Sequence, residues 1–222
     1  MNFTLLTSMP VEAIQLIYHV QTQGLRFTNV LCVGDGGPTF KILKDNAAKN
    51  GFHLQFVPDP NGIRAEAILQ AISPDVLQIQ GGKLISKNIL AIPKVGTLNT
   101  HGGILPDYPG LDSLHWAVLE DGPMGVTVHF ATKEVDRGPI VHRRFLLAQP
   151  GDSLATLLHR NHHENKWQAT AEAMLLLSSG RYKPDKQMAS EYSRRWKMGP
   201  DLISKIRLKL AMVSWEPVGG SL

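Results

Sequence analysis

Short apolar segments alternate with helical patterns over the first hundred residues, and this alternation limits the possible folds more than any other feature. The segments are four to six residues long: 3–7, 30–33, 54–57, 75–80 and 95–99. Pro10 and Pro38 stand where helices would begin, and Asn61 is placed to cap a third helix. Gly24 and Gly51 stand where the first two helices would end. Because strands separated by helices of this length form βαβ crossovers, we expect an α/β fold with a mostly parallel, twisted, Rossmann-like sheet and helices on both faces.

The remainder of the chain changes character near residue 180. We expect a helix, two strands and a long amphipathic helix, in that order: residues 111–119, 125–131, 139–147 and 152–179. Residues 1–180 would form one domain, and residues 181–222 a short C-terminal extension. From Arg181 to Lys209 there are nine Lys and Arg against three Asp and Glu, whereas the rest of the chain has fourteen against sixteen. This basic extension could bind phosphate, nucleic acid or an acidic protein face, or could present a solvated helix surface.

Two patterns within the extension favour different partners. Aromatic and basic residues interleave at Tyr192, Arg194, Arg195, Trp196 and Lys197, which could grip a phosphate or a base. Apolar residues recur at helical spacing further on, at Leu202, Ile206 and Leu210. The second pattern favours a docked helix or a homodimer contact, and we do not expect nucleic-acid binding.

Composition excludes several classes of protein. Of the 222 residues 43% are hydrophobic and 19% charged, which excludes disorder along the whole chain. No apolar run approaches the roughly 20 residues of a membrane-spanning helix. The first eight residues lack the basic segment and cleavage site of a signal peptide. Cys32 is the single cysteine, so no disulfide can form within the chain, and we expect a cytoplasmic protein.

Residues suited to acyl transfer follow the predicted strands at the end of the sheet where parallel sheets bind ligands. Asn99 and His101 are two residues apart, so on a continuing strand they project to the same side. Gly102 and Gly103 would let a ligand approach the backbone closely, and Asp136 lies in a tight turn. Acyl transfer between nitrogens needs an oxyanion stabiliser and a group that removes the proton of the attacking amine. As a purely structural alternative, Asn99, His101 and Asp136 could serve as loop and turn residues.

Two other features suggest chemistry less strongly. The turn Gly34-Asp35-Gly36-Gly37 does not fit the G-x-G-x-x-G pattern and follows the second strand, so a simple turn is preferred over a dinucleotide loop. His159, His162 and His163 share helix faces, but no H-E-x-x-H pattern accompanies them. We therefore expect exposed polar positions there and no metal site.

Several motifs follow one another in a definite order along the chain. The first motifs are Pro74-Asp75-Val76-Leu77, Ile89-Leu90-Ala91-Ile92-Pro93, Gly96-Thr97-Leu98-Asn99-Thr100-His101 and Leu105-Pro106-Asp107-Tyr108-Pro109-Gly110. The later ones are Gly125-Val126-Thr127-Val128-His129, Val135-Asp136-Arg137-Gly138-Pro139-Ile140 and Gly151-Asp152-Ser153-Leu154. Together they resemble the folate-dependent formyltransferase family, which includes glycinamide ribonucleotide, methionyl-tRNA and nucleotide-linked amino-sugar formyltransferases. The resemblance covers roughly residues 1–180, and motifs matched in order are more specific than any one alone.

The resemblance implies a role for each matching residue. Asn99, His101 and Asp136 would be catalytic: Asn99 and His101 would stabilise the oxyanion, and Asp136 would orient His101 and help move the proton. The donor would be 10-formyltetrahydrofolate and the acceptor a primary amine. The pterin of the donor would lie against two segments, represented by Gly81, Gly82, Lys83 and Leu84 and by Val135 and Gly138. The acceptor side would include Gly102, Gly103, Ile104 and Trp116, although Trp116 is better explained by packing.

Departures from the family pattern bear on the acceptor. Gly102-Gly103 stands where the family commonly has Pro-Ser, and Pro109 where a basic residue is frequent. Residues 7–10 replace the glycine-rich phosphate turn of the ribonucleotide enzyme, and the extension is too short for the second domain of the methionyl-tRNA enzyme. Elimination leaves an amino sugar or another small amine as the acceptor, and we expect a nucleotide-linked amino sugar. The alternatives are hydrolysis of 10-formyltetrahydrofolate and a folate- or nucleotide-binding module without catalysis.

Overall fold

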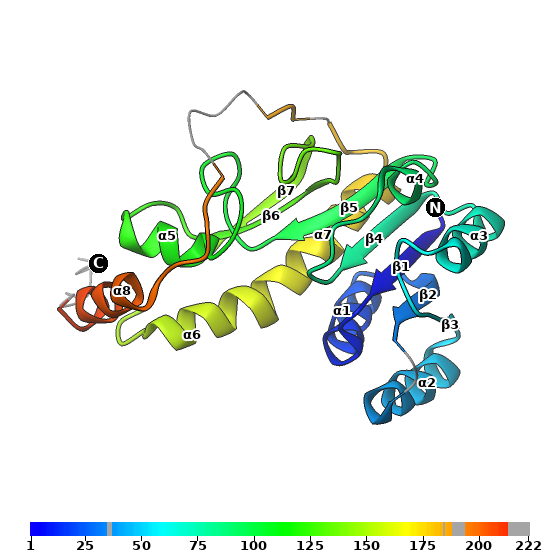
Figure 1. Cartoon of the computed structure of the whole chain (residues 1–222), viewed down its shortest axis with the longest axis horizontal. Coiled ribbons are helices and arrows are strands. Elements are labelled where there is room, and N and C mark those ends of the chain that lie inside the picture. Colours follow the sequence, from blue (N-terminus) through cyan, green and yellow to red (C-terminus); the bar gives the residue numbers. More distant parts are fainter. Residues whose placement is uncertain (35–36, 184, 188–193, 213–222) are drawn as a thin grey trace, which may run out of the picture.

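A single seven-stranded sheet forms the centre of the computed structural model, which describes residues 1–34, 37–183, 185–187 and 194–212 (Figure 1). The strands are β1 (Phe3–Thr7), β2 (Phe27–Val33), β3 (His53–Val57), β4 (Val76–Gln80), β5 (Gly96–His101), β6 (Gly125–Phe130) and β7 (Ile140–Phe145). Their order in the sheet is β3-β2-β1-β4-β5-β6-β7. Strands β1 to β5 are parallel, whereas β6 pairs antiparallel with both β5 and β7.

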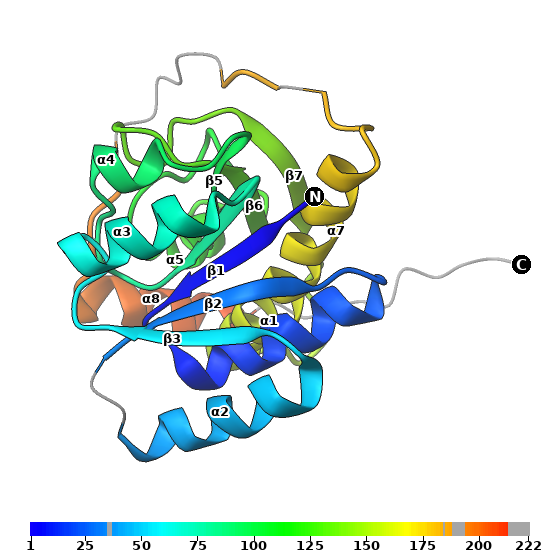
Figure 2. The same ribbon diagram turned by 90° about the vertical axis from the view of Figure 1, so that its right-hand side faces the viewer.

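Helices cover both faces of the sheet (Figure 2). One face carries α1 (Pro10–Thr22), α2 (Pro38–Asn50) and α7 (Lys166–Ser178), and the other carries α3 (Ile63–Ile72) and α4 (Lys87–Leu90). The remaining helices, α5 (Ser113–Leu119), α6 (Leu154–His159) and α8 (Pro200–Met212), share a third apolar cluster. The predicted α/β fold, with its mostly parallel sheet and two helical layers, is therefore confirmed.

The apolar side chains of the strands divide between the two layers. Leu5 and Val30 point towards α1 and α7, whereas Leu6 and Leu31 point towards α3, and all four are fully or almost fully buried. A strand that is buried on both faces needs a continuous apolar run, which is the pattern of these segments. Cys32 belongs to the first layer, and burial raises the pKa of its thiol to about 11.

The long helix predicted over residues 152–179 is correct in extent but not in regularity. Between α6 and α7 the chain forms a π-helical segment, η1 (Arg160–Asn165). The amide of Asn161 donates from this segment to the carbonyl oxygens of Gly102 (3.0 Å) and Gly125 (3.2 Å). Asn165 donates to the carbonyl oxygen of Arg144 (3.0 Å). The wider turn thus lets two amides of one helix bind the sheet, and π-helical turns of this kind are frequent at functional sites.

Asn61 does not cap α3, contrary to the sequence-based prediction. The residue before α3 is Gly62, and no side chain caps this helix. Asn61 instead donates to the carbonyl oxygen of Leu84 (2.8 Å) and accepts from the amide of Ser86 (2.8 Å). Its amide therefore fixes the loop after β4, a contact between loops distant in sequence that local pattern cannot indicate.

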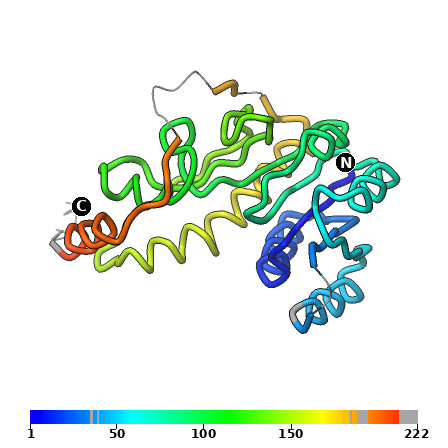
Figure 3. The backbone as a smooth tube through the Cα atoms, in the orientation of Figure 1, coloured from blue at the N-terminus to red at the C-terminus, as the bar shows by residue number. Residues whose placement is uncertain are grey.

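The described parts of the extension lie against the body (Figure 3). Ile206 is fully buried in the cluster shared with α5 and α6, and Leu202 and Leu210 pack beside it. The helix is therefore docked on its own chain, as one of the two alternatives, a docked helix or a homodimer contact, predicted. Tyr192, from the aromatic and basic pattern, lies outside the described residues. Two of the basic side chains face acids of the body, because Arg195 pairs with Glu120 (2.8 Å) and Lys209 with Asp121 (2.6 Å). None of the helices described is long and apolar enough to cross a membrane.

Candidate active site

The carboxyl end of β5 brings together the three residues expected to be catalytic. Asn99 and His101 lie on β5 itself, and Asp136 lies on the loop between β6 and β7. His101 Nδ1 is 3.5 Å from Asp136 Oδ1. A second histidine, His129 on β6, places its Nε2 3.6 Å from the same oxygen. The site is thus an amide and two imidazoles around one buried carboxylate.

The other ring nitrogen of His101 is held from behind. His101 Nε2 donates to the carbonyl oxygen of Tyr108 (2.6 Å) and lies 2.9 Å from Ser113 Oγ. Since a carbonyl oxygen can only accept, Nε2 carries the proton. In the neutral imidazole, Nδ1 then presents its lone pair towards Asp136. The contact between this lone pair and the carboxylate is repulsive. Protonation of Nδ1 would make it attractive, because an N–H group would then face the carboxylate.

Charge and burial oppose each other at His101. Burial lowers the pKa of His101, while Asp136 and the hydrogen bond to Tyr108 act to raise it and the neighbouring His129 and Lys166 act to lower it. The net effect is a lowered pKa. His101 is therefore a neutral imidazole at pH 7, which is the form that can accept a proton from an amine.

Asp136 is kept ionised by its neighbours. Burial alone would raise the pKa of this carboxyl, but its close contacts with the rings of His129 and His101 and the hydrogen bond from the backbone amide of Gly110 outweigh it. The pKa of Asp136 is about 2 as a result. Gly110 N donates to Oδ2 at 2.9 Å. Asp136 also has a φ of 58°, in the left-handed region that non-glycine residues seldom adopt, as is common where a side chain is held for function.

His129 is the member of the site that the sequence analysis did not select as a site residue. Asn99 Nδ2 lies 3.2 Å from its Nε2, and its Nδ1 donates to the carbonyl oxygen of Phe130 (3.0 Å). Asn99 and His129 are direct partners in the antiparallel pairing of β5 with β6. A signal was present, because His129 is the titratable residue of a strand rich in apolar residues, but its partner depended on the strand pairing.

A cavity of about 220 Å³ opens beside these groups. Asn99, His129 and Asp136 line one part of it, and five of the six residues expected to bind the pterin line other parts: Gly81, Gly82, Lys83, Leu84 and Val135. A Cβ on Gly82 would meet no atom within 4 Å, so the backbone here borders open space. The sixth residue, Gly138, lies elsewhere: a Cβ there would collide with the carbonyl of Phe130, so this glycine lets the loop pack on β6.

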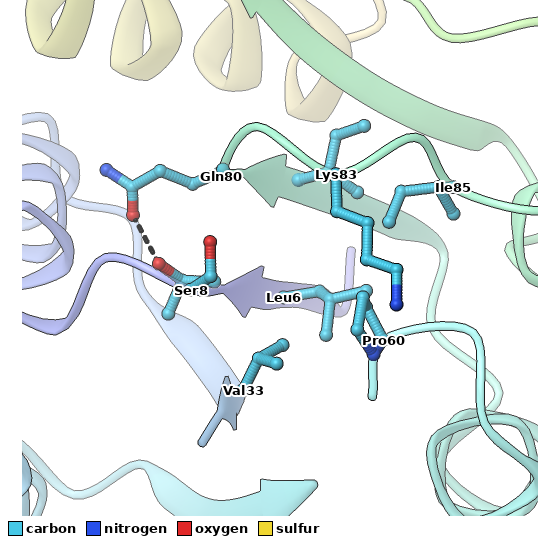
Figure 4. A pocket seen from close by; sticks show the side chains of 10 residues that line it. Leu6, Ser8, Val33, Pro60, Gln80, Lys83 and Ile85 are labelled. Carbon is cyan, nitrogen blue, oxygen red and sulfur yellow. Dashed lines mark hydrogen bonds between the residues drawn. The ribbon is translucent and has the colours of Figure 1, made fainter. Parts of the chain in front are cut away.

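A smaller cavity of about 100 Å³ adjoins the first behind the loop 81–85 (Figure 4). Its walls are apolar, with Leu6, Val33 and Ile85 among them, and Lys83 lies across its opening. Gln80 accepts a hydrogen bond from Thr7 through Oε1, whereas its buried Nε2 has no partner among the described residues. This second cavity extends the first towards β1 and β2.

Comparison with known proteins places the chain in a family. The family model described as Formyl transferase matches residues 42–174, which is more than half of the chain. The chain belongs to the formyl transferase family. A methionyl-tRNA formyltransferase of Methylacidiphilum infernorum is 35% identical over 113 residues, or 49% of this chain and 35% of that enzyme. The chain therefore spans about a third of the length of that relative.

Solved structures share the fold of this formyl transferase family member. Glycinamide ribonucleotide transformylase 1 from Symbiobacterium toebii has a TM-score of 0.65 and 26% identity, covering 81% of this chain and 88% of its own. The formyltransferase PseJ from Anoxybacillus kamchatkensis, solved with a formylated UDP-sugar and tetrahydrofolate, has a TM-score of 0.57 and 24% identity. That second comparison covers 75% of this chain and 85% of PseJ, and it is a likeness of fold.

The residues expected on the acceptor side of this formyl transferase lie in three different settings. A Cβ on Gly103 would collide with Ser113, so Gly103 is closely packed and does not open the loop. A Cβ on Gly102 would lie 3.3 Å from His162, at a wider cavity of about 510 Å³ that is also lined by Lys166 and His159. Ile104 is buried. Trp116 donates from Nε1 to the carbonyl oxygen of Trp196 (3.0 Å), which favours its role in packing.

His159 and His163 have ring centroids 4.8 Å apart. Within the described residues there is no group of three His, Cys, Asp or Glu side chains that could hold a metal ion. These histidines line the 510 Å³ cavity together with Lys166 and Glu12.

Proposed function

We propose that the chain transfers a formyl group from 10-formyltetrahydrofolate to the primary amine of a small acceptor. The observation that carries this proposal is that Asn99 and Asp136 line the 220 Å³ cavity, with His101 Nδ1 held 3.5 Å from Asp136 Oδ1. The exposed backbone of residues 81–84 and the loop 131–136 would hold the folate between them, because they form facing walls of that cavity. When bound there, the folate supplies the formyl carbon.

Asn99, His101 and Asp136 each have a separate role in the proposed transfer. An amide nitrogen has two N–H groups, so the contact of Asn99 with His129 leaves one to donate to the formyl oxygen as it gains charge. His101 Nδ1 accepts the proton of the amine as the new C–N bond forms. The same proton then passes to the departing folate nitrogen as the old C–N bond breaks. Asp136 stabilises the imidazolium in the interval.

The acceptor that best fits the site is a small amine that carries negative charge, with a nucleotide-linked amino sugar as the specific proposal. The cavity beside Gly102 supports this class through Lys166, a donor suited to phosphate, which lines it together with the neutral His162 and the carboxylate of Glu12. Lys166 and His101 are close enough for the charge of one to affect the pKa of the other. An amine anchored there would lie next to the catalytic pair.

The proposal is tested by incubating the purified chain with 10-formyltetrahydrofolate and a panel of amines, with release of tetrahydrofolate and formylated product measured together. We expect release that depends on an amine and is matched by an equal amount of product. Release without any amine would establish the hydrolase instead. Tight folate binding with neither reaction, across nucleotide sugars, ribonucleotide amines and methionyl-tRNA, would establish a binding module.

A further inference from the structure

The C-terminal extension touches both loops that hold the catalytic pair. Gln187 of the extension contacts the loop that carries Asp136. Arg195 of the extension contacts the loop whose Tyr108 binds His101 Nε2. The described parts of the extension reach these loops beside β7, where Asp185 pairs with Ile140, and from the segment that precedes α8 (Figure 1).

Arg195 is joined to the His101 loop by backbone and side chain. Its amide donates to the carbonyl oxygen of Pro109 (2.7 Å), and its own carbonyl oxygen accepts from the amide of Leu111 (3.1 Å). Its guanidinium binds Glu120 (2.8 Å) and lies 5.2 Å from the ring centroid of Trp116 and 5.8 Å from that of Tyr108. Together these contacts hold a short strand-like pairing with the loop.

The segment held by Arg195 supplies one group to each member of the catalytic pair. The carbonyl oxygen of Tyr108 accepts from His101 Nε2, and the amide of Gly110 donates to Asp136 Oδ2. Gly110 has a φ of 97°, and a Cβ there would collide with the carbonyl of Arg195. The close approach of the extension thus requires a glycine at the position whose amide binds the catalytic carboxylate.

Gln187 acts on the Asp136 loop directly. Its Nε2 donates to the carbonyl oxygens of Asp136 (3.0 Å) and Gly138 (2.8 Å). Those carbonyls lie on the turn in which Asp136 has its left-handed backbone conformation, which persists only where surrounding contacts hold it. One side-chain amide therefore joins both ends of that turn.

We propose that Gln187 and Arg195 are positioning residues, through which the C-terminal extension completes the active site by holding Asp136 and His101 at their working distance. The inference rests on the proposed formyl transfer. Neither residue touches the reacting atoms, so each acts through the loop that it binds. Because a misplacement of about 1 Å can cost roughly 100-fold in rate, we expect substitutions here to lower kcat by roughly 10-fold to 100-fold with the KM for folate unchanged.

Gln187→Met and Arg195→Met test this inference, with Lys186→Met and Lys197→Met as controls at exposed neighbouring positions. Methionine keeps most of the side-chain length but removes the donors. Arg195→Lys retains a cation opposite Glu120 and should recover part of the lost kcat. Both controls should retain wild-type kcat. Equal kcat in the test and control variants would overturn the inference.

A second measurement separates positioning from a general loss of stability. The hydrogen bond to Tyr108 raises the pKa of His101, so a loosened loop in Arg195→Met should move the acidic limb of the kcat/KM profile to lower pH. A limb that stays in place while only the melting temperature falls would also overturn the inference. Should the wild type transfer no formyl group, the proposed function fails, and the NMR titration of His101 in the same variants decides the inference by the same shift.

Discussion

His101 and Asp136 face each other at 3.5 Å, with the far side of the imidazole fixed by the carbonyl oxygen of Tyr108. This relationship makes the pair an acceptor for a single proton. The proton on Nε2 is held in the hydrogen bond to the carbonyl oxygen of Tyr108, so only Nδ1 can gain or lose a proton. Asp136, with a pKa of about 2, remains a carboxylate throughout and stabilises the proton when it arrives.

The ionisation of Asp136 links folding to pH. Its pKa in the folded chain is about 2, against an ordinary value of 3.8, so its contribution to stability is present above that ordinary value and is lost as pH falls towards 2. The shift corresponds to roughly 2 kcal/mol. In urea unfolding between pH 5 and pH 2, Asp136→Asn should lose less stability than the wild type. Asp45→Asn, on the exposed side of α2, should follow the wild type, and identical slopes for all three would refute this linkage.

His129 should matter for catalysis although it is one step removed from the formyl group. Its Nε2 lies 3.2 Å from the amide nitrogen of Asn99, which it orients, and 3.6 Å from Asp136 Oδ1. We expect His129→Phe to lower kcat by roughly 10-fold to 100-fold, because both partners lose a fixed position. His53→Phe, at an exposed position on β3, should leave kcat unchanged. A wild-type kcat for His129→Phe would show that Asn99 and Asp136 need no support from β6.

The two glycines after His101 should respond differently to alanine. In Gly103→Ala the new Cβ would collide with Ser113 and lie 3.0 Å from the carbonyl oxygen of Tyr108, so the loop that fixes His101 must move. We expect a loss of about 1–3 kcal/mol of stability and a lower kcat. In Gly102→Ala the nearest atom is 3.3 Å away on His162, and stability should be nearly unchanged. Thermal unfolding and kinetics of both variants check this, and equal effects would contradict it.

Gly82 provides a direct test of the folate cavity. A Cβ at this position meets no protein atom within 4 Å, so Gly82→Val should fold normally. If the pterin occupies the cavity, the added side chain would take up space against it and weaken folate binding by roughly 10-fold or more, as about 1.4 kcal/mol is a factor of ten. Calorimetric titration gives the affinity, with Gly199→Ala as a control that also meets open space. An unchanged Kd would place the folate elsewhere.

Patterns within single segments predicted much of this molecule. The alternating apolar runs gave the strands near their observed positions, and the spacing of Asn99 and His101 placed both at the end of β5. Asp136 was selected as a carboxylate in a tight turn, and the family resemblance then implied its catalytic role, because a turn residue carries no periodic signal of its own. These features depend on neighbours in sequence.

Contacts between distant segments were not predictable in this way. His129 gains its role from antiparallel pairing with Asn99, whereas the preceding strands are parallel. Asn61 binds the loop after β4 where a helix cap was expected, and Arg195 binds a loop far behind it in sequence. Each of these depends on which loops meet at the sheet end, which topology decides and local composition does not.

The most direct measurement is a transfer assay with donor labelled in the formyl carbon, comparing the wild type with His101→Gln on the amine that reacts best. We expect the label to appear in the amine, one equivalent for each tetrahydrofolate released. In His101→Gln the rate should fall by roughly 10² to 10⁴, the usual contribution of a general base. Label that appears only as free formate, or a His101→Gln rate equal to that of the wild type, would contradict the account.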